Sequence, residues 1–164
     1  MKVLDVGCGP ADILAHLPAV DYTGIDLNEK HIAFAQGRYG DRGRFIVGSA
    51  SDDLNQQDGT FDIVNVSGLL HHLRDSECRI LFTSLEKLLK PGGRVVTIDN
   101  VWLPQQRFIA RTLIGMDSGL NVRTPEQYLH LLDKCDFEVE SRIYQDLSRV
   151  PYDHFCMTAR KPPS

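Results

Sequence analysis

The residues with the clearest chemical signature lie at the start of the chain, where an apolar stretch runs directly into two closely spaced glycines. Lys2–Val6 has the pattern of a buried strand, and Gly7 and Gly9 follow it with Cys8 between them. Glycine lacks the Cβ atom that would block a sharp turn or the close approach of a ligand. Asp26 follows near the spacing of about 20 residues at which a second strand presents a carboxylate to a ribose. This pattern predicts a site for an adenosine-bearing molecule.

The glycine spacing argues against a dinucleotide as the ligand. A dinucleotide-binding turn has a third Gly or Ala three places after the second glycine, and this chain has Asp12 there. A carboxylate near the N-terminus of the following helix repels a pyrophosphate. An NAD-dependent oxidoreductase is therefore the less favoured hypothesis.

Two histidines are candidates for catalysis, because they follow the expected strand Phe61–Val66 at the edge of a ligand crevice. Either His71 or His72 could act as a general base near neutral pH, and we place His72 slightly before His71. The alternative is that the pair caps or packs the start of the next helix. Neighbouring histidines seldom converge on one metal ion without further ligands, so no metal is expected.

The segment 99–123 is longer than an ordinary connection of about 2–6 residues, which predicts a functional role. Apolar residues at 109, 113 and 116 suggest an amphipathic helix that caps an acceptor pocket, although core packing explains them equally well. Trp102 and three arginines are candidate acceptor-binding residues, since a guanidinium pairs well with a carboxylate. The arginines are Arg107, Arg111 and Arg123.

Strands and helices alternate along the chain, which predicts a parallel sheet covered on both faces, with a crevice at the carboxyl ends of its strands. The expected strands are 2–6, 22–26, 44–47, 61–66 and 94–98. The expected helices are 11–17, 29–39 after the N-cap Asn28, 75–89 before Pro91-Gly92-Gly93, and one with a capping box from Thr124. The stretches 137–143 and 154–160 are too close in sequence for a parallel crossover, so they should form an antiparallel hairpin.

Composition is typical of one globular domain: 164 residues, 42% hydrophobic and 24% charged. No apolar run approaches the roughly 18 residues of a membrane span, and Asp5 interrupts the first run too early for a signal peptide, so a cytoplasmic location is expected. The net charge is -4, with dispersed basic residues, which argues against nucleic acid or a membrane surface as a partner. The four scattered cysteines are expected to be reduced and mostly buried.

Several separated segments together resemble the class I S-adenosylmethionine (SAM) methyltransferases of the small-molecule type. They are Leu4–Pro10, Gly24–Asp26, Phe61–Val64, Leu69–Leu73, Leu89–Gly93 and the terminal hairpin. The resemblance spans nearly the whole chain and implies one α/β domain, 1–164, with 99–123 as its acceptor-site cap. It implies a Rossmann-like, doubly wound, seven-stranded sheet of order 3-2-1-4-5-7-6 with strand seven antiparallel. It also implies S-adenosyl-L-methionine as the cofactor and a small-molecule acceptor.

The resemblance further implies which residues hold the cofactor. Asp5 would lie behind the turn, Gly7 and Gly9 against the methionine moiety, and Asp26 on the ribose hydroxyls. The remaining expected contacts are Leu27, Ser49, Ala50 and Ser67. The family often has an acidic residue after strand three for the adenine amino group, whereas this chain has Ser49. We expect the Ser49 hydroxyl and the Ala50 backbone to take that role; in the alternatives Asp52 reaches in, or Asp52 and Asp53 are solvated charges.

The start of the chain differs from the family, which normally has one or two helices before strand one. The sequence predicts a shortened domain without them, whose uncovered flank is either a homodimer contact or part of a more open cofactor site. The principal hypothesis is an active methyltransferase. The alternatives are a SAM-binding domain without catalytic activity and, less favoured, the NAD-dependent oxidoreductase.

Overall fold

The computed structural model describes residues 1–54, 57–108, 111–112, 114, 121–145 and 153–163. Its strands form one mixed sheet of seven strands. The strand order is β3-β2-β1-β4-β5-β7-β6, which confirms the expected order. The strands are β1 (Lys2–Val6), β2 (Asp21–Asp26), β3 (Gly43–Val47), β4 (Phe61–Ser67), β5 (Leu89–Asn100), β6 (Glu138–Gln145) and β7 (Asp153–Arg160).

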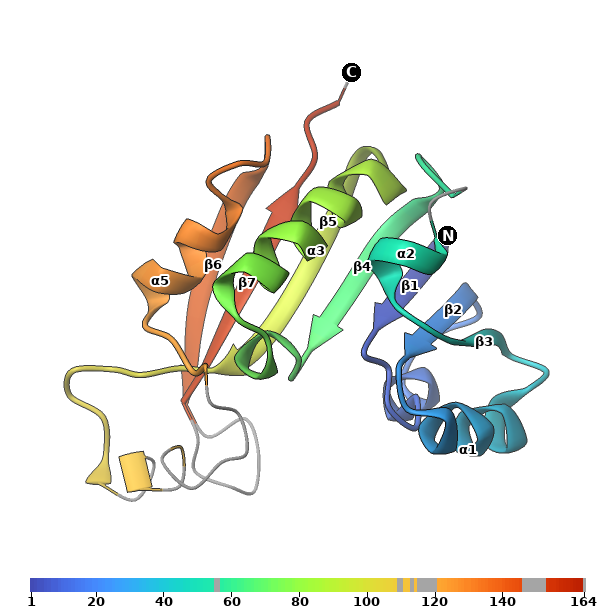
Figure 1. The fold of residues 1–164 in the computed structure, drawn as a ribbon, viewed down its shortest axis with the longest axis horizontal. Helices are drawn as coiled ribbons and strands as arrows, with labels where there is room; N and C mark the ends of the chain where they lie inside the picture. The colour runs from blue at the N-terminus through green and yellow to red at the C-terminus, as the bar shows by residue number, and fades with distance from the viewer. Residues whose placement is uncertain (55–56, 109–110, 113, 115–120, 146–152, 164) are drawn as a thin grey trace.

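The pairing directions bring several strand ends together at one edge of the sheet. Strands β1 to β5 run parallel, while β7 is antiparallel to both β5 and β6, so the closing hairpin is confirmed. The carboxyl ends of β1, β2, β4 and β5 point toward the lower edge in Figure 1. In open α/β sheets this is the edge that forms a ligand crevice.

Helices cover the face of the sheet that is turned toward the viewer in Figure 1, where α3 (Asp75–Leu88) and α5 (Pro125–Leu129) lie in front of the strands. The short helix α2 (Ala50–Asp53) lies on the same side, and the 3-10 turn η3 (His130–Leu132) follows α5. Apolar residues three or four places apart form one stripe on α3 and face the sheet. The buried members of this stripe are Cys78, Leu81, Phe82, Leu85 and Leu88.

The opposite face is covered at β1 to β3 by α1 (Glu29–Tyr39) and the 3-10 turn η1 (Asp12–Ala15), which bury a second, smaller apolar cluster. The side chain of Asn28 accepts a hydrogen bond from the Lys30 N–H at 3.0 Å, which confirms the expected N-cap of α1. No helix in the described part of the chain is long and apolar enough to cross a membrane.

The expected helix over 11–17 is wrong, because only Asp12–Ala15 is helical and it forms one 3-10 turn. Ala11 precedes it with a left-handed φ of 57°, a conformation that a right-handed helix does not contain. Pro18 limits the other end.

Strand β5 begins earlier than the sequence predicts. Its first residue is Leu89, which pairs with Phe61, and a register shift between Phe61 and Ile63 absorbs the irregular stretch that follows. Gly92 has a φ of 75°, and its N–H donates to the Lys161 carbonyl at 3.0 Å. Helix α3 thus ends at Leu88, before the Pro-Gly-Gly segment as expected, and that segment forms an irregular stretch inside β5.

All four cysteines are free; Cys8 and Cys78 are buried, and Cys135 and Cys156 are half-buried. Burial raises the pKa of the Cys8 thiol to about 12 and that of Cys78 to about 11. Both thiols are therefore protonated at neutral pH and act as small packing groups.

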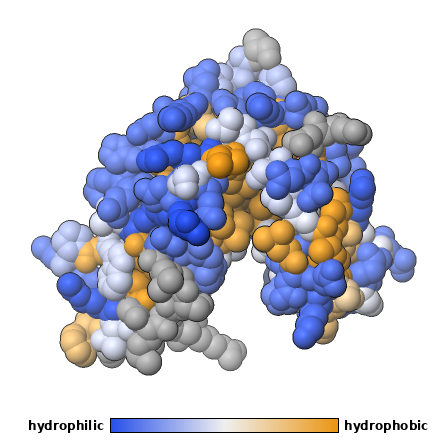
Figure 2. All heavy atoms as spheres, viewed as in Figure 1, coloured by the Kyte–Doolittle hydropathy of each residue, from blue (hydrophilic) through white to orange (hydrophobic). Residues whose placement is uncertain are grey.

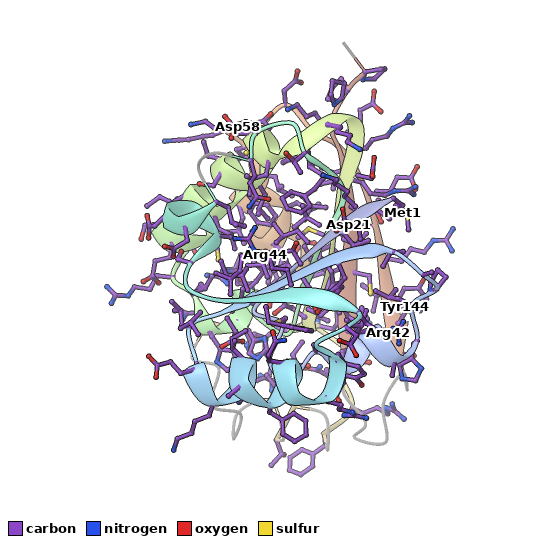
Figure 3. The ribbon with its side chains drawn as sticks, turned by 90° about the vertical axis from the view of Figure 1, so that its right-hand side faces the viewer. Met1, Asp21, Arg42, Arg44, Asp58 and Tyr144 are labelled. Atoms are coloured by element: carbon purple, nitrogen blue, oxygen red, sulfur yellow. The ribbon has the colours of Figure 1, made fainter. Side chains whose placement is uncertain are left out.

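Among the described residues, no helix lies over β4, β5, β7 and β6 on the face away from α3. Figure 3 shows the sheet edge-on, with α2 and α3 on one side and Met1 and Tyr144 on the other. A shallow hollow of about 190 Å³ on this face has an apolar lining that includes Met1, Ile13, Leu17, Ile63 and Val96.

Self-association through this uncovered face stays a prediction. A contiguous apolar surface of several hundred Å² is rarely left open on a monomer, so we expect a dimer at micromolar concentration. Light scattering over a concentration series measures this directly. A constant monomer mass over the series would contradict the prediction.

Candidate active site

A cavity of about 400 Å³ opens where the parallel strands end. Its walls come from the ends of β1 and β2, the loops after β3 and β4, and the start of α3. Figure 2 shows the molecule hollowed at this lower edge, with apolar residues along the hollow. Five residues expected to bind a cofactor line the cavity: Gly7, Asp26, Leu27, Ser49 and Ala50.

Gly7 gives the cavity a wall of bare backbone. Its φ is 68°, which L side chains rarely adopt, and a Cβ atom added to it would lie 3.2 Å from both Cδ atoms of Leu69. The N–H groups of Gly7 and Cys8 donate to the Ile25 carbonyl at 2.8 and 3.1 Å, which fixes the turn against β2. The turn thus leaves space for a ligand, and a residue larger than glycine at position 7 would reduce that space.

Asp26 ends β2 with a carboxylate that is 15% exposed and faces this turn. Its Oδ2 accepts the Gly9 N–H at 2.9 Å, and its Oδ1 accepts the Asn28 N–H at 2.8 Å. An ionised carboxylate has about four acceptor positions, so about two remain for donors from a ligand. His31 Nδ1 lies 3.7 Å from Oδ1 and adds a nearby titratable group that the sequence pattern did not identify.

The loop after β3 places Ser49, Ala50 and Asp52 in the cavity wall. Ser49 is also the N-cap of α2, because its Oγ accepts the Ser51 N–H at 3.3 Å and its N–H donates to the Asp53 carboxylate at 2.8 Å. Asp53 is therefore a capping residue as well as a surface charge. Both Ser49 and Asp52 are placed to meet a ligand, so the choice between them for adenine stays a prediction.

Asp5, Gly9 and Ser67 lie next to the cavity and are not among its described lining residues. Asp5 is buried behind the turn, where its carboxylate accepts the Tyr22 hydroxyl at 2.6 Å and the Asn65 Nδ2 at 2.7 Å. The Ser67 hydroxyl extends this network by donating to Asn65 Oδ1 at 2.9 Å. Burial raises the pKa of Asp5, and the two hydrogen bonds oppose that rise. The network fixes the ends of β1 and β4 behind the cavity.

The loop after β4 contains a buried histidine with a carboxylate partner. His71 lies in the 3-10 turn η2 (Leu70–His72), and its Nδ1 lies 2.7 Å from Asp99 Oδ1. The His71 backbone N–H donates to the same oxygen at 3.1 Å. Burial raises the pKa of Asp99, and the hydrogen bonds from His71 oppose that rise. His72 is exposed, and its ring centroid lies 4.1 Å from that of His71.

The residues expected to bind an acceptor differ in how far they are buried. Trp102 is half-buried, and its backbone N–H donates to the Arg123 carbonyl at 3.0 Å. Arg107 and Arg111 are exposed and lie one helical turn apart, since the Arg111 N–H donates to the Arg107 carbonyl at 3.0 Å. Their contact with an acceptor stays a prediction. The apolar positions Ile109, Leu113 and Met116 of the expected amphipathic helix lie outside the described residues.

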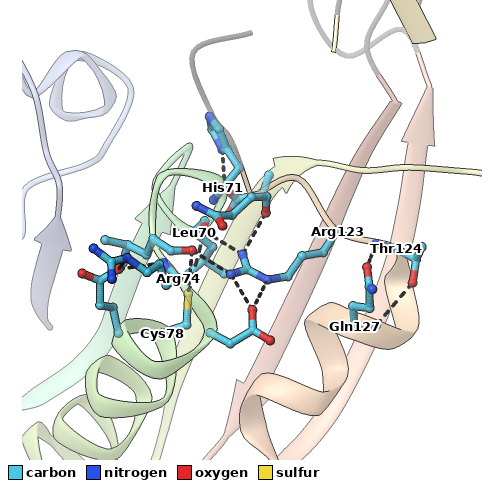
Figure 4. Close-up of polar contacts among 12 residues, drawn as sticks. Leu70, His71, Arg74, Cys78, Arg123, Thr124 and Gln127 are labelled. Atoms are coloured by element: carbon cyan, nitrogen blue, oxygen red, sulfur yellow. Dashed lines mark hydrogen bonds and ion pairs between the residues drawn. The ribbon is translucent and has the colours of Figure 1, made fainter. Parts of the chain in front are cut away.

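Arg123 differs from the expectation, because the protein itself uses all of its donors. Its Nε donates to Asp75 at 2.9 Å, its Nη1 to the Leu70 and Asn121 carbonyls at 2.8 and 3.0 Å, and its Nη2 to the Leu73 carbonyl at 2.7 Å. Nη2 also lies 2.8 Å from the Asp75 carboxylate. A guanidinium has five N–H groups, and these contacts occupy each of them. Arg123 therefore supports the loop after β4, as Figure 4 shows, and has no donor left for an acceptor.

Asp99 is a functional candidate that the sequence pattern did not identify, because it was noted only as the first residue of the segment 99–123 and not as a partner for His71. The available signal was a charged residue after the apolar run Val95–Ile98, at the carboxyl end of an expected strand. Tyr22 and Asn65 were missed as well, and no local pattern marks them, because their partner Asp5 lies 17 and 60 residues away.

Comparison with known proteins agrees with this geometry. The sequence model of a family described as "Methyltransferase domain" matches residues 3–93. The ubiquinone biosynthesis O-methyltransferase of Vibrio atlanticus is 35% identical over 100 residues, which cover 57% of this chain and 41% of that protein. Phosphoethanolamine N-methyltransferase 1 of Triticum aestivum is 33% identical over 144 residues, which cover 83% of this chain and 28% of that protein. The chain thus spans less than half the length of these relatives.

Solved structures share the fold over nearly the whole chain. A SAM-dependent methyltransferase from Methanosarcina mazei superposes with a TM-score of 0.82 at 21% identity, covering 99% of this chain and 93% of that one. Geranyl diphosphate C-methyltransferase from Streptomyces coelicolor, in complex with S-adenosyl-L-homocysteine, has a TM-score of 0.76 at 18% identity, covering 98% and 70% of the two chains. Together with the family match over more than half of its length, the sheet order and the glycine turn show that this chain belongs to the class I SAM-dependent methyltransferases.

Proposed function

We propose that this domain transfers the methyl group of SAM to a hydroxyl or amine of a small-molecule acceptor, with His71 as the general base. One observation carries the proposal: the glycine-walled cavity and the buried His71–Asp99 pair lie at the same edge of the sheet, joined by the loop after β4. The two named relatives, an O-methyltransferase and an N-methyltransferase, support this range of acceptor atoms.

The residues of the cavity fit the cofactor. The bare backbone at Gly7 provides close approach, and a Cβ atom there would reduce the space. Asp26 retains about two acceptor positions, which suits the two hydroxyl protons of a ribose. When bound, the cofactor supplies an activated methyl group whose sulfur leaves as a neutral thioether.

The work left to the protein is alignment and removal of one proton. Alignment of two bound reactants can supply about 7–11 kcal/mol of the barrier. Asp99 holds the proton of the imidazole on Nδ1, which leaves Nε2 of His71 free to accept the proton of the acceptor. The same carboxylate then stabilises the imidazolium that forms.

We further propose that residues 1–164 act as one SAM-binding domain in which the segment 99–123 covers the acceptor. Trp102, Arg107 and Arg111 remain the candidate acceptor contacts. Two of these are exposed arginines, which would suit an acidic or phosphorylated acceptor. Each of the variants Arg107→Gln and Arg111→Gln should have a raised KM for such an acceptor and an unchanged SAM affinity.

Ligand binding and turnover test the proposed function in two steps. A cofactor at 100 times its Kd stabilises a protein by about 2.7 kcal/mol, so SAM and S-adenosylhomocysteine should raise the midpoint of thermal unfolding by roughly 5–10 °C, and NAD should not. Formation of S-adenosylhomocysteine is then measured with a panel of phenols, alcohols and amines. Stabilisation by NAD alone would contradict the cofactor. Binding of SAM without turnover on any acceptor would favour the non-catalytic alternative.

Asp26 should control cofactor affinity. A hydrogen bond to a charged group contributes about 1.5–3 kcal/mol, so Asp26→Ala should weaken SAM binding roughly tenfold or more in calorimetry. Asp12→Ala is the matched control, because it removes the same charge from a side chain that is 69% exposed and pairs with Arg38. Equal SAM affinity in both variants would exclude Asp26 from the site.

A further inference from the structure

We infer that Arg123 positions the base: its guanidinium holds the loop that carries His71 and His72 at the distance from the cavity that proton transfer requires. The inference rests on the proposed role of His71. It assigns to Arg123 a function that is neither acceptor binding nor ordinary surface pairing.

The loop needs such support because it has little regular structure of its own. The turn η2 has three residues, Leu70–His72, and one 3-10 hydrogen bond closes it, from the Leu73 N–H to the Leu70 carbonyl at 3.2 Å. The Leu70 and Leu73 carbonyls, on either side of the histidines, both accept hydrogen bonds from Arg123, at 2.8 and 2.7 Å. One rigid, planar group thereby fixes the two ends of the histidine turn relative to each other, as Figure 4 shows.

A third contact comes from the backbone next to Arg123. The Asn121 N–H donates to the His71 carbonyl at 3.0 Å, and the Asn121 carbonyl accepts from Arg123 Nη1 at the same distance. The end of the 99–123 segment and the histidine turn thus share a closed set of hydrogen bonds. The position of His71 therefore depends on the placement of that segment.

Burial and charge explain why the group at this position is an arginine. The Arg123 side chain is 5% exposed, and its charge is balanced by Asp75, whose side chain is 59% exposed at the start of α3. The guanidinium carbon also lies over the Tyr128 ring, 5.7 Å from the ring centroid. A lysine would keep the charge but has three donors at one point, so it could not span the two carbonyls and the carboxylate.

This support matters because proton transfer is sensitive to position. A displacement of about 1 Å in a reacting group can cost roughly 100-fold in rate. The Nδ1 contact of His71 with Asp99 fixes the orientation of the ring, whereas Arg123 fixes the backbone from which the ring extends. Loss of Arg123 should therefore lower kcat and leave the cofactor cavity intact.

The experiment compares Arg123→Gln, Arg123→Lys and the control Arg74→Gln. Arg74 lies on the same loop, but its side chain is 81% exposed and its ion pair with Glu77 is long, at 3.9 Å. Three experiments are done on each folded variant: steady-state kinetics for kcat and KM, calorimetry for SAM affinity, and a ¹H–¹³C NMR titration for the imidazole signals of His71. The His71 signal is identified among those of the six histidines by its loss in His71→Ala.

We expect both Arg123 variants to lose about 10- to 100-fold in kcat, with SAM affinity within twofold of the unaltered protein and a shifted or broadened His71 signal. The Arg74 variant should match the unaltered protein in all three experiments. If Arg123→Gln does not fold, Arg123→Lys and Asp75→Asn, which keep most of the side-chain volume, give the same readouts.

The outcomes separate this inference from the proposed function. An unchanged His71 signal and kcat in a folded Arg123 variant would overturn the positioning role and leave His71 as the base. A moved His71 signal with full turnover in both Arg123→Gln and His71→Ala would show that the loop is held by Arg123 but that His71 is not the base.

Discussion

Replacing His71 with alanine should lower turnover by roughly 10²–10⁴-fold while SAM affinity stays within about twofold, since general base catalysis contributes a factor of that size. The effect should be on kcat, because the imidazole accepts a proton as the methyl group moves and lines no described part of the cofactor cavity. Steady-state formation of S-adenosylhomocysteine with a genuine acceptor measures kcat. Calorimetry measures the affinity.

His72→Ala is the control for this experiment. The two rings are neighbours with centroids 4.1 Å apart, but His71 has the buried carboxylate partner and His72 is exposed. We therefore expect the larger loss from His71, which reverses the order favoured from the sequence. Full turnover in both variants would mean that alignment alone drives the reaction.

Replacing Gly7 with valine should abolish measurable SAM binding, with a loss of at least about 100-fold in affinity, or about 2.7 kcal/mol. A Cβ atom added at Gly7 would lie 3.2 Å from the Cδ atoms of Leu69, and the two methyl groups of valine would extend further into the loop or the cavity. The φ of 68° adds strain, because a β-branched residue rarely adopts it. Calorimetry with SAM and circular dichroism of the same sample measure binding and folding together.

Gly9→Ala separates backbone strain from occupation of the cavity. Gly9 has a φ of 52°, so alanine there costs about 1–2 kcal/mol of stability, but nothing lies within 4 Å of an added Cβ. Binding should therefore weaken far less than in Gly7→Val. Equal affinities of the two variants for SAM, both folded, would show that the Gly7 turn is not the binding site.

Local rules explain how much of this protein can be predicted from its sequence. The glycine turn requires a residue without Cβ at a positive φ, and the helix starts require capping side chains, so Gly7, Asn28 and Thr124 can be interpreted from their neighbours alone. Alternating apolar strands and helices predict a parallel sheet. The same reasoning fails at residues 11–17, where the left-handed conformation of Ala11 leaves no local signature.

The roles of polar side chains depended on partners that are distant in the chain. Arg123 and Trp102 looked alike as candidates for acceptor binding, until the fold brought Arg123 against carbonyl groups 50 and 53 residues earlier and occupied all of its donors. His71 and His72 were equivalent in sequence, and Asp99, 28 residues away, distinguishes them.

The sequence by itself therefore determined the sheet, the glycine turn and the position of Asp26, because each depends on backbone conformation and on regular spacing within one or two elements. Only the tertiary structure decided which histidine has a carboxylate partner and that Arg123 supports the histidine loop. The physical reason is that a buried charge or donor must be satisfied by whichever groups the fold places beside it, and those groups have no fixed separation along the chain.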